Sequence, residues 1–455
     1  MSSLLTALHI STGAMQAEQG ALEAASNNVA NVNTPGYSRE IPAFSENPPF
    51  VLGNLTFGTG VSLEKLSGVR DNVLQLRIQG ESGQQGALDA LVSGLNQAQT
   101  LFTSSSSDIS SQLSNLFSSI SQLSTNPASV PLRQGVLTAA SNLASGFRNT
   151  ASNLATQASN LNLSVTQAVE QVNTLTQQIA GLNGQIAALQ NVGQDASAFV
   201  DQRDVLINQL SGLIDVSRIS SDSGITLTTS NGTALVAGGQ SFSLSTQLGA
   251  SGVQHIFAQG TDITAQLNSG QLGGLLEVRD QKIPALLAGL DTLASGVANA
   301  FNSANTAGFD LNGNNGGNLF VPPPSGPGAA ATLRVAITDP ALIAASSDGS
   351  AGSNGNLRNF SAIHDQPTIS GQTPSDYYGN LVFGLGNDVS TATAELQSSQ
   401  LVLQQLQDQR GSISGVSLDD EASHMIEYQR AYEAAARVAT TVNQMLETVI
   451  NMVNL

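Results

Sequence analysis

The chain closes with VSLDDEASHMIEYQRAYEAAARVATTVNQMLETVINMVNL, residues 416–455, a stretch without Gly or Pro. Apolar and small side chains recur in it every seven residues, and a second row follows three residues behind the first, which is the spacing of a heptad seam along one helix. Ser417 is a suitable N-cap, and the carboxylates of Asp419 and Asp420 follow at the positive end of the helix dipole. The pattern predicts a helix whose apolar stripe needs a partner, since a lone amphipathic helix gains most of its stability from packing. The stripe consists of Leu418, Met425, Tyr428, Tyr432, Ala439, Val442, Leu446, Val449 and Val453.

A second heptad row lies at the opposite end of the chain. Leu8, Met15, Leu22 and Val29 repeat at the same spacing in a segment with no Pro before Pro35, which predicts a helix over residues 3–31. The two terminal stripes can pair with each other and with neighbouring subunits. The alternative is an ordinary amphipathic helix packed in a core within the chain. Location favours pairing of the terminal stripes. Chain ends are usually the disposable parts of a domain, whereas here both ends carry clear heptad rows.

A sharp bend is predicted directly after the first helix. In Thr34-Pro35-Gly36-Tyr37, Pro pre-sets one turn residue and Gly supplies a positive φ at the next, which is the pattern of a type II turn. Asparagines crowd the preceding helix end, where their amides can cap the terminal carbonyls. The residues of this motif are Asn28, Asn31, Thr34, Pro35, Gly36 and Tyr37.

The middle of the chain has the longest helical period. One row is Leu154, Leu161, Ala168, Leu175, Leu182 and Leu189, and a second row of mainly β-branched residues accompanies it. Such rows fit either a core shared with neighbouring helices of the same chain or a coil between chains, and the first is favoured because helical segments flank the stripe. Residues 44–83 are interpreted as a connector with an extended segment. Residues 88–123 are predicted to be helical, with an interruption at the serine run 104–107.

The period changes to two after Asp215. Asn231-Gly232 and Gly238-Gly239 punctuate the alternation and predict hairpins, after which helix resumes over 275–301. The hairpins share no periodic stripe with the helices, which indicates a separate insert. The predicted fold is mainly α: an elongated multi-domain rod with paired N- and C-terminal heptad helices, a long central helical bundle and a small inserted β-domain. Its predicted domains are 1–40 with 416–455 for assembly, 41–215 with 265–415 for the helical rod, and 216–264 for the β-domain.

Composition excludes several classes of function. The formal charge is −18, only 11% of residues are charged and there are two lysines, so no basic patch for nucleic acid is expected. The chain has no Cys, no Sec-type signal and no run of about 18 apolar residues, so neither thiolate chemistry nor a membrane span is expected.

Asp310, Asn312 and Asn314 have calcium-loop spacing but lack the later ligands, so a Gly-rich turn is predicted. Asp201 and Asp204 are interpreted as an ion-pair cluster with Arg203. No catalytic residue, metal or cofactor is predicted, and the chain is not expected to be an enzyme.

Four stretches carry a family resemblance. They are SNNVANVNTPGYSRE (residues 26–40), GLNGQIAALQ (181–190), DQRDVLINQLSGL (201–213) and SLDDEASHMIEYQRAYEAAARVATTVNQML (417–446). The first resembles the N-terminal motif of the axial proteins of the bacterial flagellum, and together they resemble the hook-associated proteins of that family. The compact β-insert departs from the family pattern and leaves the outer surface undefined.

The resemblance implies a structural protein that joins hook to filament through its terminal helices. Its partners would be copies of itself in a ring or helical layer, hook protein on one side and the next hook-associated protein on the other. It also implies type III export without a Sec signal, a flagellar export chaperone on the C-terminal helix and an extracellular location. One alternative is a rod or hook axial protein, which would usually lack the long central helical run. Another is a secreted coiled-coil adhesin that works through its β-insert, and an enzyme would need an acidic pair there that the sequence does not contain.

Overall fold

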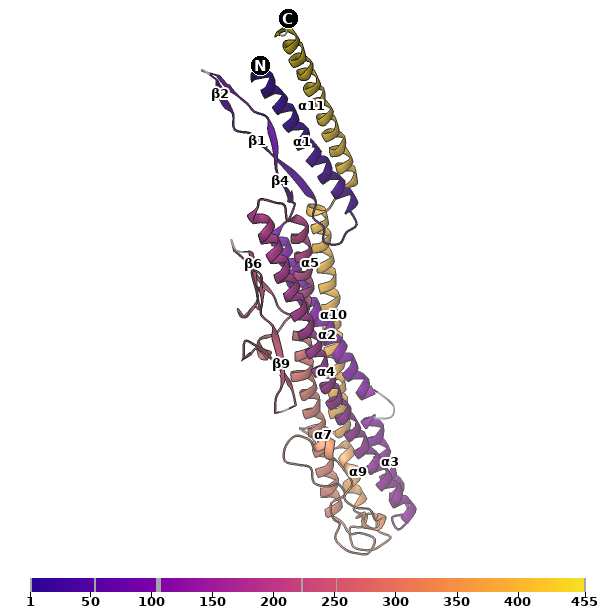
Figure 1. Ribbon diagram of the computed structural model, residues 1–455. Coiled ribbons are helices and arrows are strands. Elements are labelled where there is room, and N and C mark those ends of the chain that lie inside the picture. The colour runs from indigo at the N-terminus through magenta and orange to yellow at the C-terminus, as the bar shows by residue number, and fades with distance from the viewer. Residues whose placement is uncertain (1, 53–54, 104–107, 222–223, 251, 454–455) are drawn as a thin grey trace. The chain divides into compact units, whose positions relative to one another are not determined.

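The computed structural model describes residues 2–52, 55–103, 108–221, 224–250 and 252–453. Long helices dominate it and short strands interrupt them, which confirms the mainly α fold class (Figure 1). The α-helices are α1 (Ser2–Ala30), α2 (Asn72–Thr103), α3 (Ile109–Thr125), α4 (Val130–Asn191), α5 (Ser197–Leu213), α6 (Gly270–Glu277), α7 (Ile283–Thr306), α8 (Ala329–Thr332), α9 (Leu357–Asp365), α10 (Pro374–Ser414) and α11 (Leu418–Val453). The strands are β1 (Glu40–Glu46), β2 (Phe50–Leu52), β3 (Leu55–Phe57), β4 (Val61–Gly68), β5 (Ser217–Ser221), β6 (Gly224–Thr228), β7 (Ala234–Ala237), β8 (Gln240–Ser241), β9 (Leu244–Leu248), β10 (Gln254–Ala258) and β11 (Thr261–Asp262). Short 3-10 turns are η1 (Thr264–Gln266) and η3 (Pro340–Leu342), and a π turn, η2 (Val278–Lys282), lies between α6 and α7.

The chain forms two compact units. The first contains Met1–Gln84, Gln171–Leu244 and Ser399–Leu455, and the second contains Gln85–Glu170 and Ser245–Ser398. The long helices α2, α4 and α10 each contribute residues to both units. These units do not coincide with the three domains expected from the sequence, whose boundaries stay a prediction.

In the first unit, α1 and α11 lie side by side in opposite directions (Figure 1). The segment interpreted as a connector is more regular than expected. It folds back on itself as β1 and β4, which pair antiparallel from Glu40 with Gly68 to Glu46 with Val61, and the shorter pair β2 and β3 extends the hairpin. Both strands of the longer pair pack on α1. The prediction missed this pairing because Pro42, Pro48 and Pro49 obscure the alternation of polar and apolar residues.

The first unit also contains a four-stranded sheet in the order β5-β6-β7-β8. Its turns are the predicted ones, since Gly232 and Gly238 have positive φ angles of 84° and 55°. Leu227, Leu235 and Val236 of the sheet are fully buried. The sheet thus contributes side chains to a buried core, and the expected hairpins are confirmed.

Asparagine side chains of α4 hold the β-rich segment through its backbone. Asn183 Nδ2 donates to the carbonyls of Ile225 at 3.2 Å and Gly238 at 2.9 Å. Asn173 exchanges two hydrogen bonds with the backbone of Leu244. These contacts are polar and leave no trace in an apolar periodicity, so the spacing of apolar residues could not reveal them.

The second unit has a closely packed helical and aromatic core. The rings of Phe117, Phe320 and Phe360 lie 5.8–6.0 Å from that of Phe301 on α7. The first half of the periodic segment on α4 is buried here, including Leu154 and Val165. The predicted core within the chain is thus confirmed in preference to an exposed stripe awaiting another chain.

One helical segment of this unit has the length and composition of a membrane span. Residues Gly270–Thr306 reach a mean hydropathy of 1.2 over 18 residues. Its apolar residues Leu290, Leu293 and Val297 are fully buried in the unit. The window is 39% buried within the unit, and its buried residues belong to a folded core.

Candidate assembly site at the terminal helices

The predicted stripe of α11 faces α1. Val442 is the most deeply buried of its apolar members, at 7% exposure, and six others are half-buried: Met425, Tyr428, Tyr432, Ala439, Leu446 and Val449. Leu418 lies outside the stripe at 53% exposure, since it begins the helix, before α1 comes alongside. The side chain of Val453 lies outside the described residues. The helix begins where the sequence predicted, with the amide of Asp420 facing Ser417 Oγ at 3.4 Å.

The predicted stripe of α1 is only half-buried. Leu8, Met15, Leu22 and Val29 flank a more deeply buried row of small residues, Ala17, Ala21, Ala24 and Ala25. Small side chains are needed because α1 has neighbours on two sides. A Cβ on Gly20 would lie 2.5 Å from Leu63 Cδ2 of β4, so the glycine admits that strand. The spacing of these alanines and of Gly20 is present in the sequence, but a heptad row defined by large apolar residues does not include them.

Asn28 joins four segments at the end of α1. Its Nδ2 donates to the Glu40 carbonyl at 2.9 Å and to Glu421 Oε2 of α11 at 3.1 Å. Its Oδ1 accepts the Tyr37 hydroxyl and the Glu40 amide, both at 2.8 Å. The amide is 1% exposed, and every hydrogen-bonding position on it is used. Sequence reasoning assigned Asn28 to helix capping, whereas Asn31 does that work by donating to the Asn27 carbonyl at 3.0 Å.

The predicted turn follows this helix end. The Tyr37 amide donates to the Thr34 carbonyl at 3.2 Å, and Gly36 has a φ of 86°. Arg410 of α10 donates to the Gly36 carbonyl at 2.6 Å. A Cβ on Gly36 would lie 2.2 Å from Val205 Cγ2 of α5, so glycine is required here both by φ and by space.

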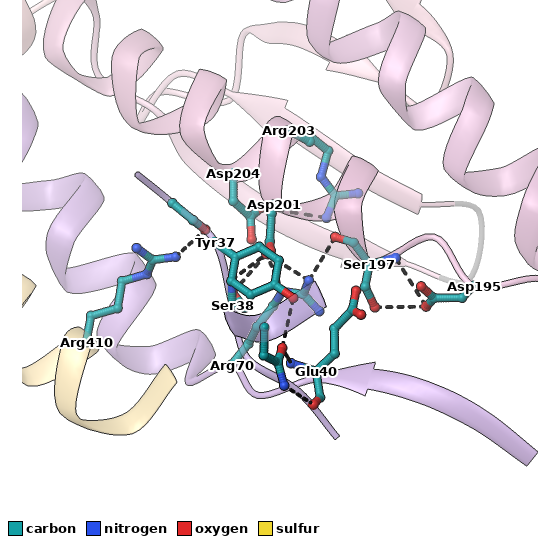
Figure 2. Close-up of polar contacts among 12 residues, drawn as sticks. Tyr37, Ser38, Glu40, Arg70, Asp195, Ser197, Asp201, Arg203, Asp204 and Arg410 are labelled. Carbon is teal, nitrogen blue, oxygen red and sulfur yellow. Dashed lines mark hydrogen bonds and ion pairs between the residues drawn. The ribbon is translucent and has the colours of Figure 1, made fainter. Parts of the chain in front are cut away.

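Asp201 is the second polar hub, and Figure 2 shows the groups around it. It accepts the amide and hydroxyl of Ser38, each at 2.8 Å. Arg70 adds an ion pair at 2.8 Å and also donates to the Ser197 carbonyl at 2.9 Å. The expected ion-pair cluster exists, but its pairing was not foreseen: Asp201 binds Arg70, which is 131 residues away, while Asp204 lies near Arg203 and Arg218. Distant pairings of this kind carry no local sequence signal.

Burial changes the acid–base behaviour of this junction. Desolvation raises the pKa of Glu40 above its ordinary value, and it raises the pKa of Tyr37 strongly, assisted by the charge of Glu40. Desolvation lowers the pKa of the Arg203 guanidinium, against the attraction of Asp204. These groups serve as hydrogen-bonding partners in a partly dry junction. The structure arranges none of them as a nucleophile beside a base.

A carboxylate lies in the seam between the two terminal helices. Glu18 of α1 faces Glu427 of α11, and its Oε2 atom is buried with no hydrogen-bond partner among the described residues. Burial raises the pKa of Glu18, and the negative charge of Glu427 raises it further. Both effects make the charged form of Glu18 unfavourable in the seam.

One side of α11 carries apolar side chains that α1 does not cover. Val438, Met445 and Met452 follow one another at seven-residue spacing and are 51%, 51% and 68% exposed. We call these three residues the outer row. Exposed apolar side chains arranged in a stripe indicate a further packing partner.

The described residues contain no group of three or more His, Asp or Glu side chains placed to hold a metal ion. In the former calcium candidate, the Asp310 carboxylate accepts the amides of Asn312 and Asn314 at 2.8 and 2.9 Å. This is the predicted turn, in which backbone N–H groups already donate hydrogen bonds to the Asp310 carboxylate.

Comparisons with known proteins agree with this architecture. The terminal segments match two family models of flagellar axial proteins: "Flagella basal body rod protein" over residues 8–37, and "Flagellar basal body rod FlgEFG protein C-terminal" over 409–452. The chain is thus of the flagellar axial class. Residues 95–320 match "Flagellar hook-associated protein FlgK helical domain".

Full-length relatives narrow the assignment. Flagellar hook-associated protein 1 of Bacillus subtilis (strain 168) is 30% identical, with 99% of each chain covered. That of Escherichia coli (strain K12) is 26% identical, covering 99% of this chain and 100% of the relative. The chain belongs to the flagellar hook-associated protein 1 family, as the sequence motifs indicated. A solved structure of the flagellar hook junction protein FlgK from Burkholderia pseudomallei has the same fold, with a TM-score of 0.67 at 18% identity, covering 74% of this chain and 100% of that one.

Proposed function

We propose that this chain, a structural component of the bacterial flagellum, joins hook to filament by packing its terminal helices against neighbouring subunits. The observation that carries the proposal is the unequal coverage of α11. One side of the helix packs on α1, while the outer row stays exposed. Where such a row packs on an unlike surface of the next identical subunit the contact is head-to-tail, and head-to-tail contacts generate rings or helical layers.

The proposed partners follow from that position. Copies of the chain form the layer, with hook protein on one side and the next hook-associated protein on the other. Before assembly, a flagellar export chaperone covers the exposed side of α11, because a free apolar row promotes aggregation. Export through the flagellar type III apparatus without a Sec signal brings the chain to an extracellular location. The role is structural and requires no catalytic step.

Electron microscopy of the source bacterium with the chain deleted tests the proposal. We expect hooks without filaments, and restored filaments when the full chain is supplied from a plasmid. A chain lacking residues 416–455 is the second arm, and should be found unassembled in the medium or the cell. Normal filaments in the deletion strain would overturn the proposal.

The same experiment separates the alternatives. A rod or hook protein would leave cells without complete hooks, whereas a secreted adhesin would leave filaments intact and reduce attachment. The relatives that cover the whole chain favour the junction role over both, since the rod-type family models match only the terminal segments.

A further inference from the structure

The small hairpin β2–β3 exposes an unusual amount of apolar surface. Phe50, Val51, Leu55 and Phe57 make up most of its two three-residue strands, and the last three are 68%, 64% and 41% exposed. The rings of Phe50 and Phe57 stack at 5.5 Å. We call these four residues the hairpin patch.

The hairpin patch lacks the support that a stable sheet needs. β2 and β3 pair only with each other among the described strands. An isolated two-stranded hairpin is marginally stable in water, and contiguous exposed apolar side chains usually mark an interaction site. The patch is therefore expected to be covered in the assembled protein.

We propose that the hairpin patch of one subunit receives the outer row of α11 from a second copy of this chain. The inference rests on the proposed function and names the surfaces that meet. Both surfaces are exposed within the chain, so neither covers the other there. The methionines of the outer row suit an aromatic surface, since thioether sulfur makes favourable contacts with ring edges.

Charge at the borders fits the same pairing. Arg430 and Arg437 lie along α11 beside the outer row, and neither forms an ion pair among the described residues. Glu46 and Glu64 are exposed on the hairpin that carries the patch, and they too are without an ion pair in the part of the chain described. In a chain of charge −18, contact between copies meets general repulsion, so cations placed opposite anions favour this orientation.

The geometry also makes the contact directional. α1 presents Gly20 to Leu63 of β4 and Glu18 to Glu427 of α11, so strand and helix occupy different sides of α1. A subunit thus offers a hairpin patch on one side and an outer row on another. Repetition of one contact between unlike surfaces adds subunits successively instead of closing a two-fold dimer.

Disulfide cross-linking tests the contact, and because the natural chain has no Cys, only the introduced thiols of this chain can react. Val51→Cys and Met445→Cys are introduced together into the full chain, which replaces the native copy in the source bacterium. After mild oxidation, denaturing gels without reductant should show a ladder of cross-linked multimers. A mixture of the two single-Cys chains should give dimers only, and each single-Cys chain alone should give none. The matched control pairs Val51→Cys with Gln444→Cys, which is exposed on α11 beside the outer row and should cross-link at least tenfold less.

The outcomes distinguish this contact from the junction role itself. Cells that carry filaments but yield no cross-link between residues 51 and 445 would overturn the contact and leave the junction role standing. A cross-link from residue 51 to a different protein would also overturn it, since the occupant would then be another flagellar component.

A charge exchange covers the case in which the Cys chains fail to assemble. Glu46→Arg should reduce the fraction of cells with filaments severalfold, and adding Arg437→Glu should restore it. The pairing would be overturned if the double variant does not restore filaments while circular dichroism shows that the single and double variants are both folded. Hooks with filaments in the complete deletion strain would instead overturn the junction role.

Discussion

Helices α7 and α11 differ in how much of their apolar surface the chain itself covers. α7 buries residues along its whole length, from Ile283 to Asn305, and packs its aromatic side chain against three others. α11 is half as long again, yet only Glu421 and Val442 are buried among its described side chains. The central helices thus form a complete core, whereas the terminal pair is one side of a core that neighbouring subunits are expected to complete.

The two regions also differ in what fixes their geometry. Close packing orients the central helices, while polar hubs fix the terminal pair at one end, through Asn28 to Glu421 and through Ser38 to Asp201. Buried hydrogen bonds of this type add modest stability but specify register, because any misalignment leaves polar groups without partners. The two terminal helices therefore have a fixed register but leave apolar side chains of α11 exposed, and this combination is suited to assembly.

The largest expected effect comes from placing a charge in the seam. Leu446→Asp should abolish incorporation into the flagellum, because an unpaired carboxylate in an apolar contact is strongly unfavourable. Hydrogen exchange of the free subunit should show faster exchange in α1 and α11 and unchanged protection in α3 and α7. Glu447→Asp, on the exposed side of the same helix, is the control. Loss of protection in α7 would contradict the independence of the two regions.

Gly36→Val should weaken the link at the base of the terminal pair. A β-branched residue at a φ of 86° costs about 1–3 kcal/mol, and the new side chain also collides with Val205. We expect few filaments and a lower free energy of unfolding in urea. Gly36→Val combined with Val205→Ala separates the two causes, since it relieves the collision and leaves the backbone strain. Full recovery in the double variant would show that the turn imposes no strain of its own.

Asn183→Ala tests the attachment of the β-rich segment to α4. The substitution leaves the carbonyls of Ile225 and Gly238 without their donor, which should cost about 1–3 kcal/mol of unfolding free energy. Amides of β6 and β7 should exchange faster, while α11 is unaffected. Asn160→Ala, at an exposed position on the same helix, should change stability by less than about 0.5 kcal/mol. Equal effects of the two substitutions would contradict the structural role of Asn183.

Periodicity predicted the helices well because it reports directly on which side of an element is buried. The limits of α1 and α11, the hairpins at Gly232 and Gly238 and the stripe that faces α1 all follow from local spacing. The roles proposed for these residues in assembly stay predictions. What spacing could not reveal were contacts between distant polar residues, such as Arg70 with Asp201 and Asn28 with Glu421. The hairpin of β1 to β4 was missed for a different reason: Pro42, Pro48 and Pro49 obscure the alternation of polar and apolar residues along its strands.

The smallest expected effect is a pH dependence confined to the terminal pair. Glu18 lies between the helices with Glu427 and Tyr428 nearby, and burial raises its pKa above the ordinary 4.5. Because the folded pair binds the proton more tightly than the unfolded chain, this contribution is fully present below pH 4.5 and lost as the pH rises through the raised pKa. Lowering the pH from 7 toward 5 should therefore slow hydrogen exchange in α1 and α11, after correction for intrinsic rates, relative to α7. Glu18→Gln keeps the shape without the charge and should stabilise the pair at pH 7 and flatten its pH response, whereas Glu23→Gln, on an exposed side of α1, should leave both unchanged. If the Glu18→Gln variant keeps the full pH response of the native chain, the seam carboxylate is not its source, and the incomplete burial of the pair would have to be explained without a charge between the helices.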